Sequence, residues 1–333
     1  MHKFPTTAAA GGRIFFCSGN FVKAPFHGPP DIFTTENFYL HAEVKGIMGL
    51  ESKEFKALIS LLDDDDEQIV SHVQEKILSL GTGVIPFLEE EWESNFNSEV
   101  QRRIEDLIHA LQYDLLKERL REWFQTEDHD LLTGMWLVTT YQYPDLEQLK
   151  LRQELEQIYY ETWLEFKPDL YPFDQIKVIN SVLFSKLKFG ANTKNFHSPG
   201  NSMLNIVLES RKGNPITLCV IYMLVAQKLK LPVYGVNLPN LFVLTYRDER
   251  QNQFYINAFN KGLIFSKQDI ENYISELHLT PQPTFFEPCS NLEIVRRVLR
   301  NLIMSFDKMG DHDKAEEVKE LLLIIADGTD LGV

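Results

Sequence analysis

The chain has 333 residues, of which 44% are apolar and 24% are charged, close to the composition of ordinary globular proteins. A chain of this length can bury a substantial core without disulfides or metal ions. Its formal net charge of −15 repels phosphate backbones and anionic lipids, which argues against nucleic acids and membrane surfaces as partners, although Arg296, Arg297 and Arg300 remain a local basic docking point.

Residues 1–47 combine proline, glycine, threonine and aromatic residues without a hydrophobic period. Only Gly11 to Asn20 has a strand-like pattern, and the segment lacks the basic start and single apolar run of a secretory signal. We therefore expect a poorly ordered N-terminal extension. A translation start assigned upstream of the native one would explain it.

Residues 48–128 show the pattern of short amphipathic helices. Apolar residues recur at spacings of three and four in segments that begin at Phe55, Ile69, Val84, Val100 and Leu115. Asp63 to Glu67 separates the first two segments, and Gly81 ends the second. Such pairs resemble HEAT-type repeats, so we predict a HEAT-like helical region, with a plain bundle that has no binding groove as the alternative.

Beyond residue 128 the pattern changes from helices to short strands and back. The segments predicted as helices are Leu131 to Val138, Leu146 to Phe166, Phe173 to Leu187, Met203 to Ser210 and the segment from Pro215 to Lys230. Strands are predicted at Val233 to Val236, Phe242 to Arg247 and Phe254 to Ile256, and a final helical pair at Leu292 to Lys308 and Asp313 to Ile325. Residues 190–202 are predicted to form an ordered loop.

The three cysteines are Cys17, Cys219 and Cys289, an odd number without metal-ligand spacing. They indicate neither a disulfide framework nor a zinc site, and they favour a reducing, cytoplasmic location. We expect no cofactor and no metal ion. The sequence has no apolar stretch of eighteen residues, so no transmembrane helix is predicted.

Two segments carry a resemblance to a known family. Asn201 to Asn205 and Val207 to Leu218 closely resemble the central motif of SirB1-type proteins, bacterial members of the transglutaminase-like superfamily. Tyr143 to Leu146 and Leu231 to Pro239 resemble flanking pieces of the same family. The resemblance covers about residues 130–275, and the last two helices look like its tetratricopeptide-like tail.

The resemblance implies an α+β, mostly helical protein with a transglutaminase-like (papain-like) core and a small antiparallel sheet, flanked by helical-repeat-like segments. The expected domains are an extension over residues 1–47, a HEAT-like region over 48–128, the core over 129–280 and a tetratricopeptide-like helical pair over 281–333.

The chemistry of the superfamily uses a cysteine at a helix N-terminus, a histidine on the following strand and an aspartate on the next one. The matching positions here are Pro215, Leu241 and Asn257. They supply no nucleophile, no base and no carboxylate. We therefore interpret the core as catalytically degenerate.

An enzymatic alternative stays open. Cys219 lies about one turn into the helix that follows Asn214, where it reads either as a small buried residue or as a displaced nucleophile. Thr217 is nearby, and His197 lies in the polar loop before Asn201. With His197 as base, Cys219 or Thr217 would make the protein an amide hydrolase or acyl transferase.

The degenerate site should leave a cleft of amides and aromatic rings that suits a peptide ligand. Its predicted lining is Asn214, Asn237, Asn240, Phe242, Tyr255, Asn257 and Asn260, with Phe259 beside them. These amides could instead satisfy only the loop backbone. We predict a non-catalytic protein-binding or scaffold role with a protein or peptide partner. The sequence gives no oligomeric state, and a role in transcription follows only by analogy with the SirB1 name.

Overall fold

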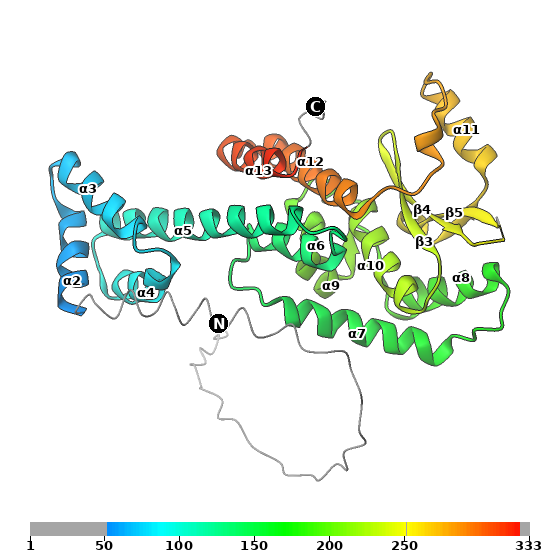
Figure 1. Cartoon of the computed structure of the whole chain (residues 1–333), viewed down its shortest axis with the longest axis horizontal. Helices are drawn as coiled ribbons and strands as arrows, with labels where there is room; N and C mark the ends of the chain where they lie inside the picture. The colour runs from blue at the N-terminus through cyan, green and yellow to red at the C-terminus, as the bar shows by residue number, and fades with distance from the viewer. Residues whose placement is uncertain (1–51, 251, 327–333) are drawn as a thin grey trace, which may run out of the picture. The chain divides into compact units, whose positions relative to one another are not determined.

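In the computed structural model, residues 52–250 and 252–326 are described, and they belong to a unit that begins at Ser52 (Figure 1). The extension expected over residues 1–47, with Cys17, lies outside them. The fold confirms the prediction of an α+β, mostly helical protein with a small antiparallel sheet. Across the described ranges, no helix is long and apolar enough to cross a membrane.

The first described helices form an antiparallel group that ends on one long helix. Their bounds are α2 Ser52–Ser60, η1 Leu61–Asp63, α3 Glu67–Leu78, η2 Thr82–Val84, α4 Ile85–Ser94 and α5 Ser98–Phe124. Asp66 begins α3, because its side chain accepts a hydrogen bond from the backbone N–H of Gln68. The two helices predicted from Val100 and Leu115 form the single helix α5. No glycine or proline interrupts α5, and its buried stripe continues through Leu111 and Leu116.

Three helices follow α5: α6 Leu131–Thr140, α7 Gln148–Glu165 and α8 Pro172–Asn180. After α8, residues Ser181–Lys186 form a π-helical turn, in which the N–H of Leu187 donates a hydrogen bond to the carbonyl of Val182. Gly134 of α6 lies in close contact with side chains of α5 and of a later helix. A Cβ at this position would lie 2.7 Å from both Trp123 Cζ2 and Val295 Cγ2.

The predicted loop over residues 190–202 contains short regular pieces. The elements from here to the sheet are β1 Gly190–Ala191, η4 Pro199–Ser202, α9 Leu204–Ser210, β2 Lys212–Gly213 and α10 Pro215–Lys228. β1 and β2 pair in parallel, which ties the loop to the start of α10.

The main sheet has the antiparallel order β3-β4-β5-β6. Its strands are β3 Val233–Leu238, β4 Leu241–Arg247, β5 Gln253–Asn257 and β6 Leu263–Phe265. Pro239 and Asn240 join β3 to β4, and Asn240 has φ 55°, a conformation that asparagine tolerates. Alternation along the strands sends Leu244 and Ile256 into the main core, whereas Tyr255 lies in a second cluster.

After the sheet come α11 Lys267–Glu276, η6 Pro283–Phe285, α12 Asn291–Met309 and α13 His312–Ile324. The sequence pattern did not predict β6 and α11. α11 covers the second cluster with Ile270 and Ile274. The last two helices match the predicted pair, and Gly310 ends α12 with φ 83°.

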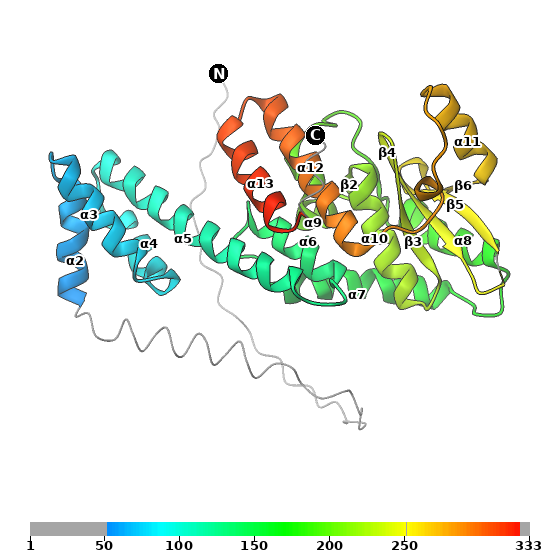
Figure 2. The same cartoon turned by 45° about the horizontal axis from the view of Figure 1, so that its top comes forward.

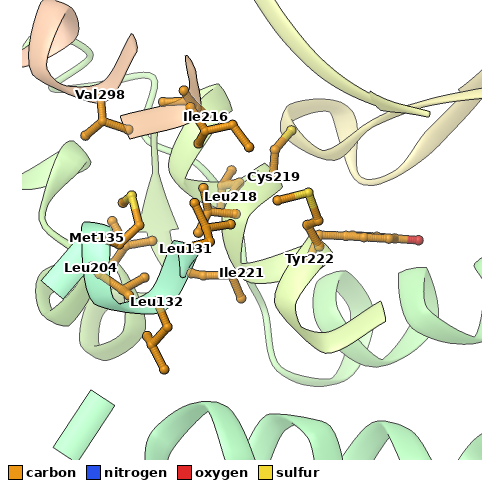
Figure 3. Packing of buried hydrophobic residues seen from close by; sticks show 14 of the residues in the cluster. Leu131, Leu132, Met135, Leu204, Ile216, Leu218, Cys219, Ile221, Tyr222 and Val298 are labelled. Carbon is orange, nitrogen blue, oxygen red and sulfur yellow. The ribbon is translucent and has the colours of Figure 1, made fainter. Parts of the chain in front are cut away.

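Helix α10 lies at the centre of the core. All residues from Ile216 to Met223 are buried, so the helix has no polar face and no amphipathic period. Figure 3 shows Leu204 of α9 and Val298 of α12 on one side of α10, while Cys219 and Tyr222 point to the other side. The position matched to the family's nucleophile therefore begins a helix that is buried on all sides over most of its length.

Candidate functional site

The N-terminus of α10 is held by the side chain of Asn214. Its Oδ1 accepts a hydrogen bond of 2.9 Å from the N–H of Thr217, and its Nδ2 donates one of 2.9 Å to Ser202 Oγ. Pro215 takes the first helical position, where its missing N–H costs nothing. Asn214 is only 7% exposed, so its amide is committed to structure.

A chain of amides fixes the loop in front of this helix. Asn192 Nδ2 donates to Asn201 Oδ1 at 2.8 Å, and Asn201 Nδ2 donates to the carbonyls of Asn195 and Phe196 at 2.7 and 2.9 Å. The Asn201 side chain is buried with both its oxygen and its nitrogen hydrogen-bonded, and its backbone carbonyl accepts a hydrogen bond of 3.5 Å from the Asn214 N–H, which links the loop to the start of α10. The sequence reading included Asn201 in the family motif without a structural role.

The structure divides the predicted cleft residues among several environments. Asn257 begins the 3₁₀ turn η5, Ala258–Asn260, and its Oδ1 accepts a hydrogen bond from the N–H of Asn260. Phe242 is buried in the main core, and the predicted neighbour Phe259 lies edge-on to Phe196. Asn240 and Asn260 are exposed.

Two of the predicted cleft residues lie in environments that the sequence pattern did not predict. Tyr255 lies on the sheet face that α11 covers, and its hydroxyl donates to the carbonyl of Phe286 at 3.1 Å. This placement follows from the strand alternation, which separates Tyr255 from the side of the sheet that packs on α10. Asn237 has a buried Oδ1 without a hydrogen-bond partner in the described part of the chain.

Cys219 lies where α10, β4 and η5 meet. Its side chain is fully buried, and its thiol donates a weak hydrogen bond of 3.7 Å to the carbonyl of Phe242. Burial raises the pKa of the Cys219 thiol far above its usual range, because a thiolate would lose its hydration. The thiol is therefore protonated at neutral pH, the opposite of what a nucleophile requires.

The other fallback candidates do not complete a catalytic group. Thr217 is fully buried, and its Oγ1 has no partner among the described residues. His197 is exposed, and its ring lies 3.0 Å from Lys308 Nζ on α12 and edge-on to Phe196. The His197 ring contacts Lys308 and Phe196 and not Cys219 or Thr217, so His197 is not positioned as a base for either candidate.

The sequence pattern did not indicate a second network of side-chain hydrogen bonds, which centres on Asn180. Asn180 Nδ2 donates to the carbonyl of Gly262 at 2.8 Å, and the Tyr222 hydroxyl donates to Asn180 Oδ1 at 3.0 Å. Gly262 has φ 73°, and a Cβ on it would lie 1.9 Å from Asn180 Oδ1. The network joins α8, α10 and the β5–β6 turn. In the sequence, only Gly262 after Asn260-Lys261 indicates that a tight turn stands at this place.

Open surface hollows occur away from these residues. One lies between α2 and α3, lined by Leu58, Asp66, Gln68, Ile69, His72, Val73 and Lys76. A second lies between α5 and α6, with a lining that includes His109, Tyr113 and Tyr141. Over residues 52–250 and 252–326, no group of three His, Cys, Asp or Glu side chains is placed to hold a metal ion.

Comparison with known families identifies the central part of the chain. Residues 149–300, from α7 into α12, match the model of the transglutaminase-like superfamily. The chain carries a transglutaminase-like domain. Within this domain, the expected papain-like arrangement of a central helix against an antiparallel sheet is formed by α10 and β3 to β6.

Relatives of the transglutaminase-like domain occur in bacteria and in animals. A UPF0162 protein of Xylella fastidiosa is 29% identical over 203 residues, which is 58% of this chain and 70% of the relative. The F-box only protein 21 of Mus musculus is 27% identical over 154 residues, or 44% of this chain and 23% of the relative. A UPF0162 protein of Pasteurella multocida is 28% identical over 108 residues, 32% of this chain and 41% of the relative. No solved structure matches the chain significantly.

Proposed function

We propose that this protein is a non-catalytic binding or scaffold protein built on a degenerate transglutaminase-like core of SirB1 type. The observation that carries the proposal is the start of α10. Pro215 begins this helix at the position that the family resemblance assigns to the nucleophile, and Cys219, about one turn further into the helix, is fully buried with a raised pKa. A thiol in this state has neither the charge nor the access that acyl transfer needs.

The structural hydrogen bonds of the amide side chains also favour a binding role over a catalytic one. Asn214 and Asn257 each hold the backbone of a neighbouring turn, so neither orients a base. The free thiols of Cys219 and Cys289 agree with a reducing, cytoplasmic location.

The relatives support a modular use of the domain. The part of the mouse F-box only protein 21 that matches this chain is 23% of that protein, so the domain recurs inside a much longer chain. Recurrence in different contexts suits a module that contributes contacts, although the same fold can host unrelated activities.

The test compares the wild-type protein with the Pro215→Cys variant, using a thiol- and hydroxyl-reactive acyl probe and adduct mapping by mass spectrometry. The new thiol would stand at the first position of α10, where the helix dipole lowers a cysteine pKa. We expect rapid labelling at position 215 in the variant and no selective labelling of Cys219 or Thr217 in the wild type. Selective, rapid acylation of either wild-type residue would instead support the hydrolase or acyltransferase alternative.

A further inference from the structure

One partly exposed face of α12 is positively charged, in contrast to the net charge of −15 of the chain. Arg297, Arg300, Met304 and Lys308 follow one another at spacings of three and four, which places them on one side of the helix. We call these four residues the α12 basic face. Met304 is 56% exposed, and the ring of His197 lies beside Lys308.

The acidic side chains of α12 are engaged with other partners. Glu293 Oε1 accepts a hydrogen bond of 2.8 Å from Arg296 Nη1, and Asp307 Oδ1 lies 3.4 Å from His312 Nδ1. Neither carboxylate forms a recorded ion pair with Arg297 or Lys308. The carboxylates of α12 therefore do not neutralise the positive charges of Arg297 and Lys308.

Arg297 lies in the first half of α12, close to Tyr273 of α11. One turn earlier, Ile294 packs on β3, where a Cβ at Gly235 would lie 3.1 Å from its Cδ1. Figure 2 shows α12 lying alongside α13. Tyr273 of α11, whose hydroxyl donates to the carbonyl of Pro239 at 2.8 Å, is close enough that it and Arg297 perturb each other's pKa. The Arg297 side chain is partly buried there, and its guanidinium has no hydrogen bond or ion pair with any described residue.

This environment means that the charged Arg297 side chain lowers the folding stability of the free protein. Loss of hydration and the neighbouring Arg300 both lower the pKa of Arg297, and no carboxylate offsets them. A partly buried cation without a counter-ion is destabilising, and an added carboxylate relieves that cost. A guanidinium can hold a carboxylate with two parallel hydrogen bonds, which gives the contact a defined geometry.

We propose that the α12 basic face binds an extended acidic peptide segment of a partner protein, with one carboxylate on Arg297 and a second near Lys308. The two positions are eleven residues apart in α12, about 16 Å at a rise of 1.5 Å per residue. An extended chain advances roughly 3.3 Å per residue, so the two acidic residues of the segment stand about five positions apart. An apolar residue between them contacts Met304.

Charge favours a peptide over a nucleic acid at this face. A polyanion would bring phosphates over the remaining acidic surface, and its affinity depends on neutralising many of them. A short segment with two carboxylates matches the small extent of the basic face. The inference rests on the proposed binding role and is independent of the residues at the start of α10.

The test measures binding of a fluorescein-labelled synthetic peptide to the full chain at low ionic strength. The peptide carries two Glu residues five positions apart with one Leu between them, in a Ser-Gly background. We expect saturable binding that Arg297→Gln weakens by about tenfold or more, because a charge-assisted contact is lost. Arg297→Lys keeps the positive charge but cannot form two parallel hydrogen bonds to a carboxylate, so it should weaken binding by an intermediate amount.

Arg250→Gln is the matched control, because it removes the same charge from an exposed residue of the β4–β5 hairpin. It should weaken binding by less than about twofold. The proposal is overturned if the peptide with Gln in place of Glu binds equally well, if Arg250→Gln equals Arg297→Gln, or if duplex DNA binds more tightly. If Arg297→Gln does not fold, equal binding by Arg297→Lys and the wild type overturns it. Selective acylation of Cys219 together with peptide binding would contradict the non-catalytic role alone.

Discussion

The protonation state of Cys219 can be measured as a pH dependence of stability. Burial raises the pKa of this thiol in the folded protein, whereas a cysteine in the unfolded chain ionises near about pH 8.5. A group whose pKa is raised by folding stabilises fully below its unfolded pKa. Its contribution is lost as the pH rises above about 8.5 toward the folded value.

The magnitude follows from linkage. Each pH unit between the unfolded and folded pKa removes about 1.4 kcal/mol, so Cys219 should cost about 2 kcal/mol of unfolding free energy between pH 7 and pH 10. The perturbation is Cys219→Ala, which removes the thiol and leaves the tyrosines and Cys289 in place. The stability advantage of the wild type over this variant should therefore shrink by about 2 kcal/mol over that pH range.

The assay is urea unfolding of both proteins at pH 7, 8, 9 and 10, with free energies from linear extrapolation. Cys289→Ala is a useful comparison, because burial raises the pKa of that thiol to about 12 and predicts a change of the same sign. A wild-type advantage over Cys219→Ala that stays constant with pH would refute the reasoning. It would mean that the folded thiol ionises as easily as the unfolded one.

Three further predictions concern the packing around α10 and can be checked by the same unfolding assay. Gly262→Ala should cost about 1–3 kcal/mol more than Gly310→Ala, because both have positive φ but only Gly262 faces an atom, Asn180 Oδ1, at 1.9 Å; equal losses would show that Asn180 moves aside freely. Thr217→Val should leave stability unchanged or raise it by up to about 1 kcal/mol, since the hydroxyl is buried without a partner, and a clear loss would reveal a partner. Asn214→Ala should cost about 1–2 kcal/mol through the lost helix cap and the lost Ser202 contact, and a neutral effect would contradict the structural role of this amide.

Local signals predicted much of the fold. Apolar spacing and capping residues located α3, α10 and the final helical pair. The segment of α5 was wrongly divided into two helices, although no helix-breaking residue is present in it. α11 was missed despite a capping box, in which Ser266 and Asp269 bond to each other's backbone.

The candidate site was harder to predict because it depends on tertiary placement. The motif correctly brought Asn214 and Pro215 to the start of one helix, but it carries no information on what Asn214 binds. Tyr255 faces α11 because its direction is set by the register of β5 against β4. Arg297 drew attention only as part of a basic run. Its partial burial without an ion pair to any described residue depends on the tertiary placement of α12, which a local pattern does not contain.

The most direct test of the non-catalytic role is the rate at which an alkylating reagent modifies Cys219 at pH 8, in the native protein and in denaturant, with adducts located by mass spectrometry. We expect native modification to be about a thousandfold slower or more, because a fully buried thiol becomes accessible only when the surrounding core opens. Native modification as fast as in the unfolded chain, or faster, would show an exposed and activated thiol and would contradict a role limited to binding.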